Sequence, residues 1–118
     1  MKPKYNFFKN TKYALQGLED IIKNERSFLI ELIFLPFIFV FLFFIEIDFI
    51  YKILMLSSFF GILICEAINA SIERCVDLVT LEYNEFAKQA KDAASAAVFL
   101  SIFICVLIWS FILLKNFF

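Results

Sequence analysis

Four polar side chains recur at helical spacing along one stretch of the sequence. Glu66, Asn69, Glu73 and Asp77 stand at positions i, i+3, i+7 and i+11. On an α-helix, which turns by about 100° per residue, these positions fall within about 80° of arc and form one polar stripe. The stripe begins inside an apolar segment, where acidic side chains usually face a protein interior and act on ions or substrates. A hydrogen-bonded ladder between helices, or a solvated helix end, is the simpler interpretation.

Two further acids lie nearer the N-terminus. Glu25 precedes an apolar segment, and Glu31 lies within that segment, nearly two turns beyond Glu25. If Glu25 and Glu73 meet at one depth, the pair suits Mg²⁺, which prefers one or two carboxylates together with phosphate oxygens. The simpler interpretation of Glu25 is a favourable charge near a helix start. For Glu31 it is a hydrogen-bonded polar spot between helices, and contact with a lipid headgroup is the functional alternative.

Lys91 and Asp92 precede a run of small residues, from Ala93 to Ala97, that includes Ser95. A phosphate is favoured where the amides of a helix N-terminus meet a Lys side chain. Small residues in membrane helices usually permit close helix packing. Packing is therefore the expected role of the alanines, while Ser95 is also able to hydrogen-bond a substrate.

The composition excludes several classes of function. The sequence has no His, and its three cysteines, Cys65, Cys75 and Cys105, show no metal-ligand spacing. Thiolate or imidazole metal sites and His-based mechanisms are therefore excluded, and acid–base chemistry must use carboxylates or Lys. The 11 basic and 12 acidic residues nearly balance, so the overall charge gives no indication of nucleic-acid binding.

The elements that must position these residues are membrane helices. The 63% share of hydrophobic residues exceeds the roughly 45–50% of soluble domains, and a lipid bilayer accounts for the excess. Three apolar segments are long enough to cross a hydrocarbon core of about 30 Å. We therefore predict an all-α membrane protein with a single domain over residues 1–118. Its expected elements are a surface helix at about 4–24 and transmembrane helices at about 27–46, 50–82 (with a cytoplasmic extension) and 90–115, the last two joined by a polar connection over about 82–91.

The predicted surface helix is amphipathic. Phe8, Leu15 and Ile22 share an apolar face, opposite a face that carries Lys9 and Lys23. This pattern is typical of a helix that lies in the membrane interface. The segment lacks the continuous apolar core and the cleavage site of a secretory signal, so we expect it to remain in the mature protein.

Basic residues orient the three predicted crossings. They concentrate before the first crossing and around the connection between the second and the third. These residues are Lys2, Lys4, Lys9, Lys12, Lys23, Arg26, Arg74, Lys88 and Lys91. Only Lys52 and Lys115 lie on the other side. We therefore expect a cytoplasmic N-terminus and a C-terminus on the opposite side of the membrane.

The motifs together resemble a known family. The segment from Glu66 to Asp77 has the pattern ExxNxxxExxxD, and Ala90-Lys91-Asp92 with its small-residue run follows some 14 residues later. Glu82-Tyr83-Asn84-Glu85 and the series Tyr13, Gly17, Asn24 and Glu25 match as well. This pattern resembles the small prokaryotic diacylglycerol kinases, whose relatives include undecaprenol kinases, over nearly the whole chain.

The resemblance implies a homotrimer of the bacterial inner membrane that transfers the γ-phosphate of ATP to a lipid hydroxyl, with a periplasmic C-terminus. It implies that Glu66 is the general base, that Asn69 orients the reacting groups, and that Glu25 and Glu73 bind the Mg²⁺ that accompanies ATP. The implied nucleotide contacts are Tyr13, Glu25, Glu73, Glu82, Tyr83, Asn84, Lys91 and Asp92. The implied contacts with the lipid substrate are Glu31, Lys52, Glu66, Ser95 and Trp109.

The chain departs from the family pattern at some positions of the nucleotide region. Family members often carry Arg at the position of Asn6, His at that of Asn84, and Gly-Arg at that of Lys88-Gln89. Lys4, Lys9 or Lys88 is able to supply a missing positive charge near the phosphates.

The leading hypothesis is an ATP- and Mg²⁺-dependent diacylglycerol kinase that binds no nucleic acid. Undecaprenol is the alternative substrate, because both lipids offer one hydroxyl at the interface and an apolar body. The alternatives outside this class are a small membrane assembly protein, whose polar stripe is a packing device, and an ion conductor with a carboxylate-lined path.

Overall fold

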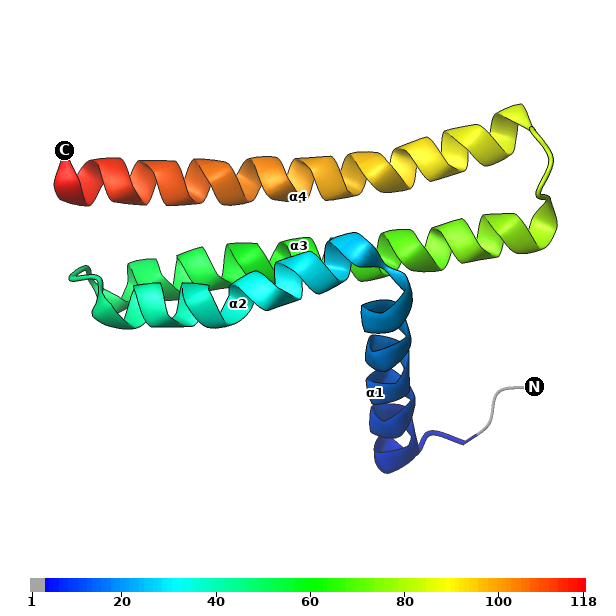
Figure 1. Cartoon of the computed structure of the whole chain (residues 1–118), viewed down its shortest axis with the longest axis horizontal. Coiled ribbons are helices and arrows are strands. Elements are labelled where there is room, and N and C mark those ends of the chain that lie inside the picture. The colour runs from blue at the N-terminus through cyan, green and yellow to red at the C-terminus, as the bar shows by residue number, and fades with distance from the viewer. Residues whose placement is uncertain (1–3) are drawn as a thin grey trace.

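The computed structural model describes residues 4–118, which form four α-helices and no strand. Lys2, used above for orientation, lies outside the described residues. The helices are α1 (Phe7–Asn24), α2 (Arg26–Phe44), α3 (Phe49–Val79) and α4 (Glu85–Phe117). Figure 1 shows α2, α3 and α4 lengthwise beside one another and α1 standing across them. The predicted all-α fold, with one amphipathic helix before three helices long and apolar enough to cross a membrane, is confirmed.

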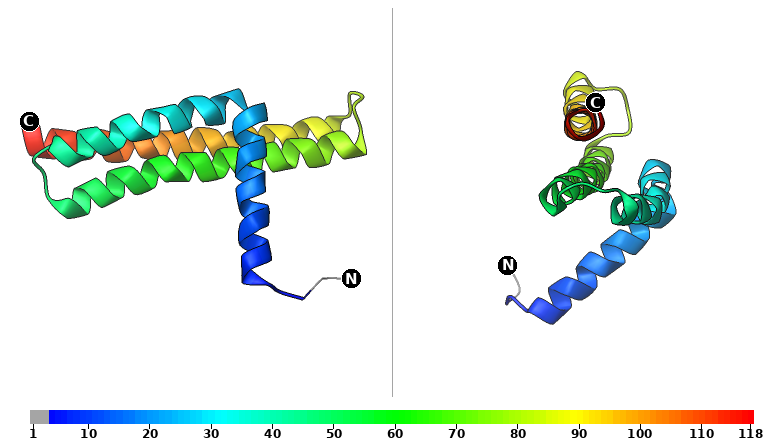
Figure 2. Two further views of the ribbon diagram at one scale, coloured as in Figure 1. Left: turned by 60° about the horizontal axis from the view of Figure 1, so that its bottom comes forward. Right: turned by 90° about the vertical axis from the view of Figure 1, so that its left-hand side faces the viewer.

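The chain turns sharply between α1 and α2. The Asn6 side chain caps α1 by accepting the Lys9 backbone N–H at 3.1 Å. The helix ends at Asn24, because the backbone of Glu25 is extended, with φ −115° and ψ 105°. A new helix then starts at Arg26 and runs through Pro36 to Phe44. Both views in Figure 2 show α1 projecting from the other three helices. Glu25, between the end of α1 and the start of α2, stands at this turn.

The connection between α3 and α4 is shorter than predicted. The structure corrects the polar connection expected over 82–91, because α3 already ends at Val79 and α4 begins at Glu85. The Asn84 side chain decides this start, since its Oδ1 accepts the backbone N–H groups of Phe86 at 2.9 Å and Ala87 at 3.1 Å. Such capping satisfies amides that the first helical turn leaves without partners.

The best-packed part of the fold lies at the end of the bundle away from this connection. Met55 is 0% exposed and forms a buried cluster with Leu42 and Ile112, so that α2, α3 and α4 all contribute. The indole N–H of Trp109 donates to the backbone carbonyl of Met55 at 3.0 Å, which fixes α4 against α3.

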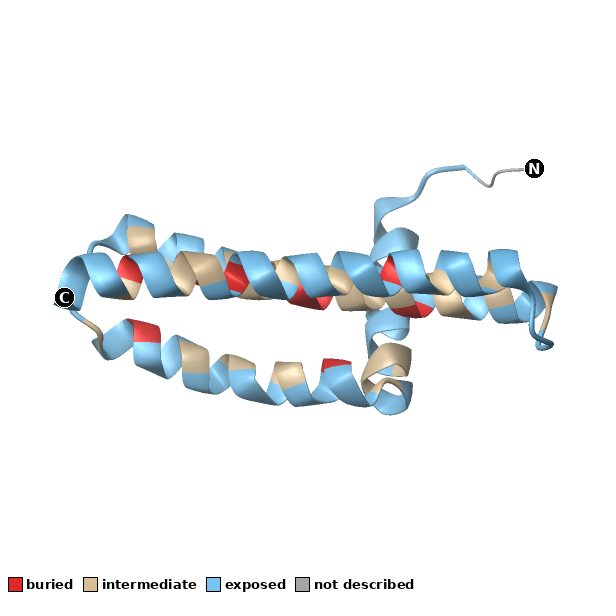
Figure 3. Cartoon of the chain, turned by 90° about the horizontal axis from the view of Figure 1, so that it is seen from above, coloured by how far each residue is buried: buried red, intermediate tan, exposed pale blue. Residues whose placement is uncertain are grey.

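Most large apolar side chains of α2 and α4 are exposed. Pale blue, the colour of exposed residues, covers most of the ribbon in Figure 3. Water does not tolerate apolar surfaces of this extent on a folded monomer, whereas lipid and neighbouring chains do. The backbone groups of these helices are satisfied internally, as a hydrocarbon environment requires. The fold is therefore that of a protein embedded in a membrane.

Candidate active site

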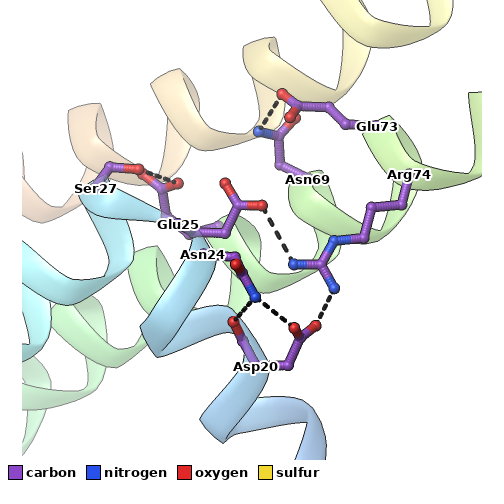
Figure 4. Close-up of polar contacts among 8 residues, drawn as sticks. Asp20, Asn24, Glu25, Ser27, Asn69, Glu73 and Arg74 are labelled. Carbon is purple, nitrogen blue, oxygen red and sulfur yellow. Dashed lines mark hydrogen bonds and ion pairs between the residues drawn. The ribbon is translucent and has the colours of Figure 1, made fainter. Parts of the chain in front are cut away.

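Glu66 lies where α2 contacts α3. Its Oε2 accepts the hydroxyl hydrogen of Ser27 at 3.2 Å. Ser27 lies in the first turn of α2 (Figure 4). Glu31, also on α2, is close enough to Glu66 for the two carboxyl groups to interact. Its Oε2 is buried without a hydrogen-bond partner. The structure thus places a hydroxyl and two carboxyl groups together beside apolar surface, an arrangement able to receive and orient a lipid hydroxyl.

Asn69 and Glu73 form the next pair along the stripe. The Asn69 Nδ2 donates to Glu73 Oε1 at 3.2 Å, within one turn of α3. The Asn69 Oδ1 is buried and has no partner. An unpartnered amide oxygen beside a carboxylate lacks one donor or cation, since buried polar atoms normally have a partner. This part of the stripe is therefore built to hold something more than its own side chains.

Glu25 reaches the same region from the corner between α1 and α2, but its contact in the structure is a cation. The Nη2 of Arg74 lies 3.5 Å from Glu25 Oε1, and Nη1 pairs with Asp20 of α1. Figure 4 shows the guanidinium between these two acids. The hydrogen bond from Arg74 holds the pKa of Asp20 below its usual value. Glu25 and Glu73 thus have separate partners in the structure, Arg74 and Asn69 respectively.

The donor atoms fit Mg²⁺ although they do not by themselves enclose it. Within residues 4–118, no group of three or more Cys, Asp or Glu side chains is arranged to hold a metal ion. Glu25, Glu73 and the unpartnered oxygen of Asn69 are hard oxygen donors, which Mg²⁺ prefers. Because Mg²⁺ is usually bound by one or two carboxylates plus phosphate oxygens and water, an incomplete protein shell is what such a site requires.

Predicted nucleotide contacts gather in one hollow beside the α3–α4 connection. This hollow has a volume of about 400 Å³, and Lys88 also lines it. The predicted residues that line it are Glu82, Tyr83, Asn84, Lys91 and Asp92. The Lys91 Nζ binds Asp77 Oδ1 at 2.8 Å and is close enough to Glu73 to interact with its charge. The hollow is thus linked to the polar stripe through Lys91.

Several predicted residues lie away from this group. Tyr13 lines a separate hollow at the start of α1, together with Lys4 and Lys9. Lys52 lies in the first turn of α3, about 21 Å from Glu66 at 1.5 Å per residue, and Trp109 packs at that same far end. Ser95 is exposed on α4. The structure therefore places Tyr13, Lys52 and Trp109 away from the polar stripe within one chain.

Three polar side chains of this region are not predicted from the sequence: Asp20, Ser27 and Arg74. Arg74 was used only to orient the chain, although it stands directly after Glu73. That adjacency alone does not predict its contacts, because successive residues of a helix point about 100° apart and the partners of Arg74, Asp20 and Glu25, lie on other elements. Nothing in the sequence marks Ser27, whose contact with Glu66 depends on the packing of α2 on α3.

Comparisons with known proteins place the chain among membrane kinases. A family model described as prokaryotic diacylglycerol kinase matches residues 12–113. The diacylglycerol kinase of Haemophilus influenzae is 36% identical over 104 residues, which cover 88% of this chain and 88% of that protein. The diacylglycerol kinase of Escherichia coli K12 is 33% identical over 105 residues, 89% of this chain and 86% of that protein. The diacylglycerol kinase of Helicobacter pylori strain 26695 is 35% identical over 103 residues, covering 86% and 80%.

Proposed function

The chain belongs to the prokaryotic diacylglycerol kinase family, and from that membership we propose that it transfers the γ-phosphate of ATP to the free hydroxyl of diacylglycerol. The products are phosphatidic acid and ADP. The hydroxyl oxygen forms the new bond to phosphorus, the bond from the γ-phosphorus to the bridging oxygen breaks, and ADP leaves with that electron pair. The hydroxyl proton has to be taken up by the protein.

Glu66 is the proposed acceptor of that proton. It lies where α2 meets α3, next to apolar surface from which a lipid hydroxyl can approach. Ser27 fixes one carboxylate oxygen, and the other remains available to the substrate. A positioned base of this kind contributes about 10²- to 10⁴-fold to the rate. Asn69, one turn further along, orients the reacting groups through its unpartnered oxygen.

Glu25 and Glu73 would hold the Mg²⁺ that accompanies ATP. When bound, Mg²⁺ would neutralise the phosphate charge, and charge neutralisation is most of what a phosphoryl-transfer site has to provide. Lys91 adds positive charge between this pair and the hollow at the α3–α4 connection. The hollow takes the nucleotide through Glu82, Tyr83, Asn84 and Asp92. Tyr13 joins these contacts only if a neighbouring chain brings it there.

The carrying observation is the order of groups along α3. From Glu66 to Glu73 the stripe runs from apolar surface to the nucleotide hollow, so lipid and nucleotide meet on one helix face. We place this hollow in the cytoplasm and the C-terminus in the periplasm, in a bacterial inner membrane. Because one chain leaves the site open and its apolar faces exposed, the homotrimer implied by the resemblance supplies the remaining walls.

A substrate assay on the purified protein tests this function. In one detergent, with ATP and Mg²⁺, we expect labelled phosphate to pass to diacylglycerol and, at equal concentration, far less to undecaprenol. Glu73→Ala should abolish this transfer while the helix content measured by circular dichroism stays unchanged. If phosphate passes only to undecaprenol, undecaprenol and not diacylglycerol is the substrate. Full activity of Glu73→Ala would exclude Glu73 as a metal ligand.

A further inference from the structure

Arg74 connects two elements that the sequence does not place together. Its guanidinium pairs with Asp20 on α1 and, at 3.5 Å, with Glu25 at the corner before α2, while Arg74 itself lies on α3. Of the described basic side chains in α3, only Arg74 lies in the half that carries the polar stripe. Figure 4 shows the side chain extending from α3 to both acids.

Stability alone does not account for this contact. The side chains are half-exposed, with 44% of Arg74, 47% of Asp20 and 31% of Glu25 accessible. Ion pairs with this exposure contribute little to the free energy of unfolding. Glu25 is, however, one of the two carboxylates proposed to hold a divalent cation. A guanidinium on that carboxylate competes with any metal ion for the same negative charge.

The geometry lets Arg74 leave Glu25 without losing its counter-charge. The contact with Asp20 is the closer of the two, and Asn24 Nδ2 holds Asp20 by donating to its Oδ1 at 2.6 Å. Beside Arg74 is a hollow of about 240 Å³ lined by small residues that include Gly17, Ala67 and Ala70. A Cβ at Gly17 would meet nothing within 4 Å, so the guanidinium has space in which to move.

We propose that Arg74 is the resident counterion of Glu25, which neutralises this carboxylate before the nucleotide arrives and yields it to the divalent cation that enters with the nucleotide. This inference rests on the proposed function, because it takes Glu25 as a metal ligand. Free metal then binds poorly, since it has to displace or share space with a fixed positive charge. The negative phosphates of the nucleotide offset the positive charges of both Arg74 and the metal ion. The metal ion and the nucleotide therefore bind more tightly together than either does alone. Arg74 is thus a positioning residue that couples the two ligands.

Binding of Mn²⁺, measured by the electron paramagnetic resonance signal of the free ion, tests this coupling. The titration uses the full chain in lipid nanodiscs, with and without a non-hydrolysable ATP analogue. For Arg74→Gln we expect Mn²⁺ alone to bind about fivefold tighter or more than to the wild type, which is the lower end of usual coupling factors. The enhancement of Mn²⁺ binding by the analogue should shrink by a similar factor.

Two further variants separate competition from a structural role. Asp20→Asn releases Arg74 from α1 and leaves Glu25 as its main partner, so Mn²⁺ alone should bind more weakly than to the wild type. Arg26→Gln is the matched control, because it removes a neighbouring positive charge that forms no ion pair among residues 4–118. It should change Mn²⁺ binding much less than Arg74→Gln does.

Unchanged or weaker binding of Mn²⁺ to Arg74→Gln overturns the inference, as does equal tightening by Arg26→Gln. Because a variant with damaged packing would bind both ligands worse, only a gain for the metal with a loss of coupling supports the counterion role. The lipid assay is independent of this result. If the wild type transfers phosphate to lipid but Arg74→Gln binds Mn²⁺ as the wild type does, the proposed function stands and only the counterion role is lost. If the wild type does not transfer phosphate to lipid, the proposed function itself is overturned.

Discussion

The two ends of the helix bundle are held together in opposite ways. At the far end, Met55 is fully buried among apolar side chains of three helices, and the indole of Trp109 and the hydroxyl of Ser58 both donate to its backbone carbonyl. At the other end, Glu31 and Asn69 each keep a buried oxygen without a partner, and the contacts are half-exposed ion pairs. The first arrangement is complete within one chain, whereas the second lacks partners.

This difference indicates that the two ends of the bundle have different roles. Close packing in a membrane gives a rigid assembly without any polar cost. Unpartnered polar atoms are costly, and native proteins keep few of them, most often where a ligand or a neighbour completes the set. The far end therefore anchors the helices, and the polar end is where we propose the chemistry.

The largest expected effect is at the polar end. Glu66→Gln keeps the size of the side chain and its contact with Ser27 but removes the proposed proton acceptor. We expect turnover to fall by roughly 10²- to 10⁴-fold. Phosphate transfer to diacylglycerol measures turnover, and size-exclusion chromatography shows whether the oligomer persists. Dissociation of the oligomer would instead make the stripe a packing device.

Removing the centre of the apolar end should damage stability but not chemistry. Met55→Ala creates a cavity among Leu42, Ile112 and Trp109. We expect unfolding to become easier by about 2 kcal/mol, at the low end of core truncations, because in lipid mainly packing is lost. Circular dichroism during an SDS titration measures this change. Leu54→Ala, at a 45% exposed position, is the control. A large loss of turnover in folded Met55→Ala would contradict the division between the ends.

The start of α4 offers a smaller effect at the border of the nucleotide hollow. Asn84→Ala removes the cap on the Phe86 and Ala87 amides and should cost about 1 kcal/mol of stability. Asn84→Ser keeps a capping oxygen and should restore most of that loss. Thermal unfolding followed by circular dichroism compares the two. Equal stability of both variants would show that the cap does not determine where α4 begins.

The smallest effect is an acid sensitivity of the α1 contact. Because Arg74 lowers the pKa of Asp20 from 3.8, the contact is fully stabilising above that value and is lost as the pH falls through the lowered pKa. A spin label on Cys75, which lines the adjoining hollow, should become more mobile only below about pH 4. The label is placed in a chain whose Cys65 and Cys105 are replaced by Ala. In Asp20→Asn this pH-dependent step should be absent, and a step that remains would assign it to another acid.

The pattern of the chain predicts most of the fold and part of the site. Uninterrupted apolar segments determine the three long helices, and the period of Glu66, Asn69, Glu73 and Asp77 places them on one face of α3. The gathering of Glu82, Tyr83, Asn84, Lys91 and Asp92 in one hollow also follows from the sequence, because these residues stand close together along the chain. The early start of α4 was missed, since the capping role of Asn84 depends on local backbone geometry.

By itself the sequence determined that this protein is helical, that it belongs in a membrane and that acids share one face of its middle crossing, because periodicity and hydropathy are local properties of the chain. The tertiary structure decided that Ser27 binds Glu66 and that Arg74 binds Glu25 and Asp20. These contacts join residues far apart in the chain. Which residues pair depends on the angle between α1 and α2 at Glu25 and on how these two helices pack against α3. Neither feature produces a periodic pattern in the sequence.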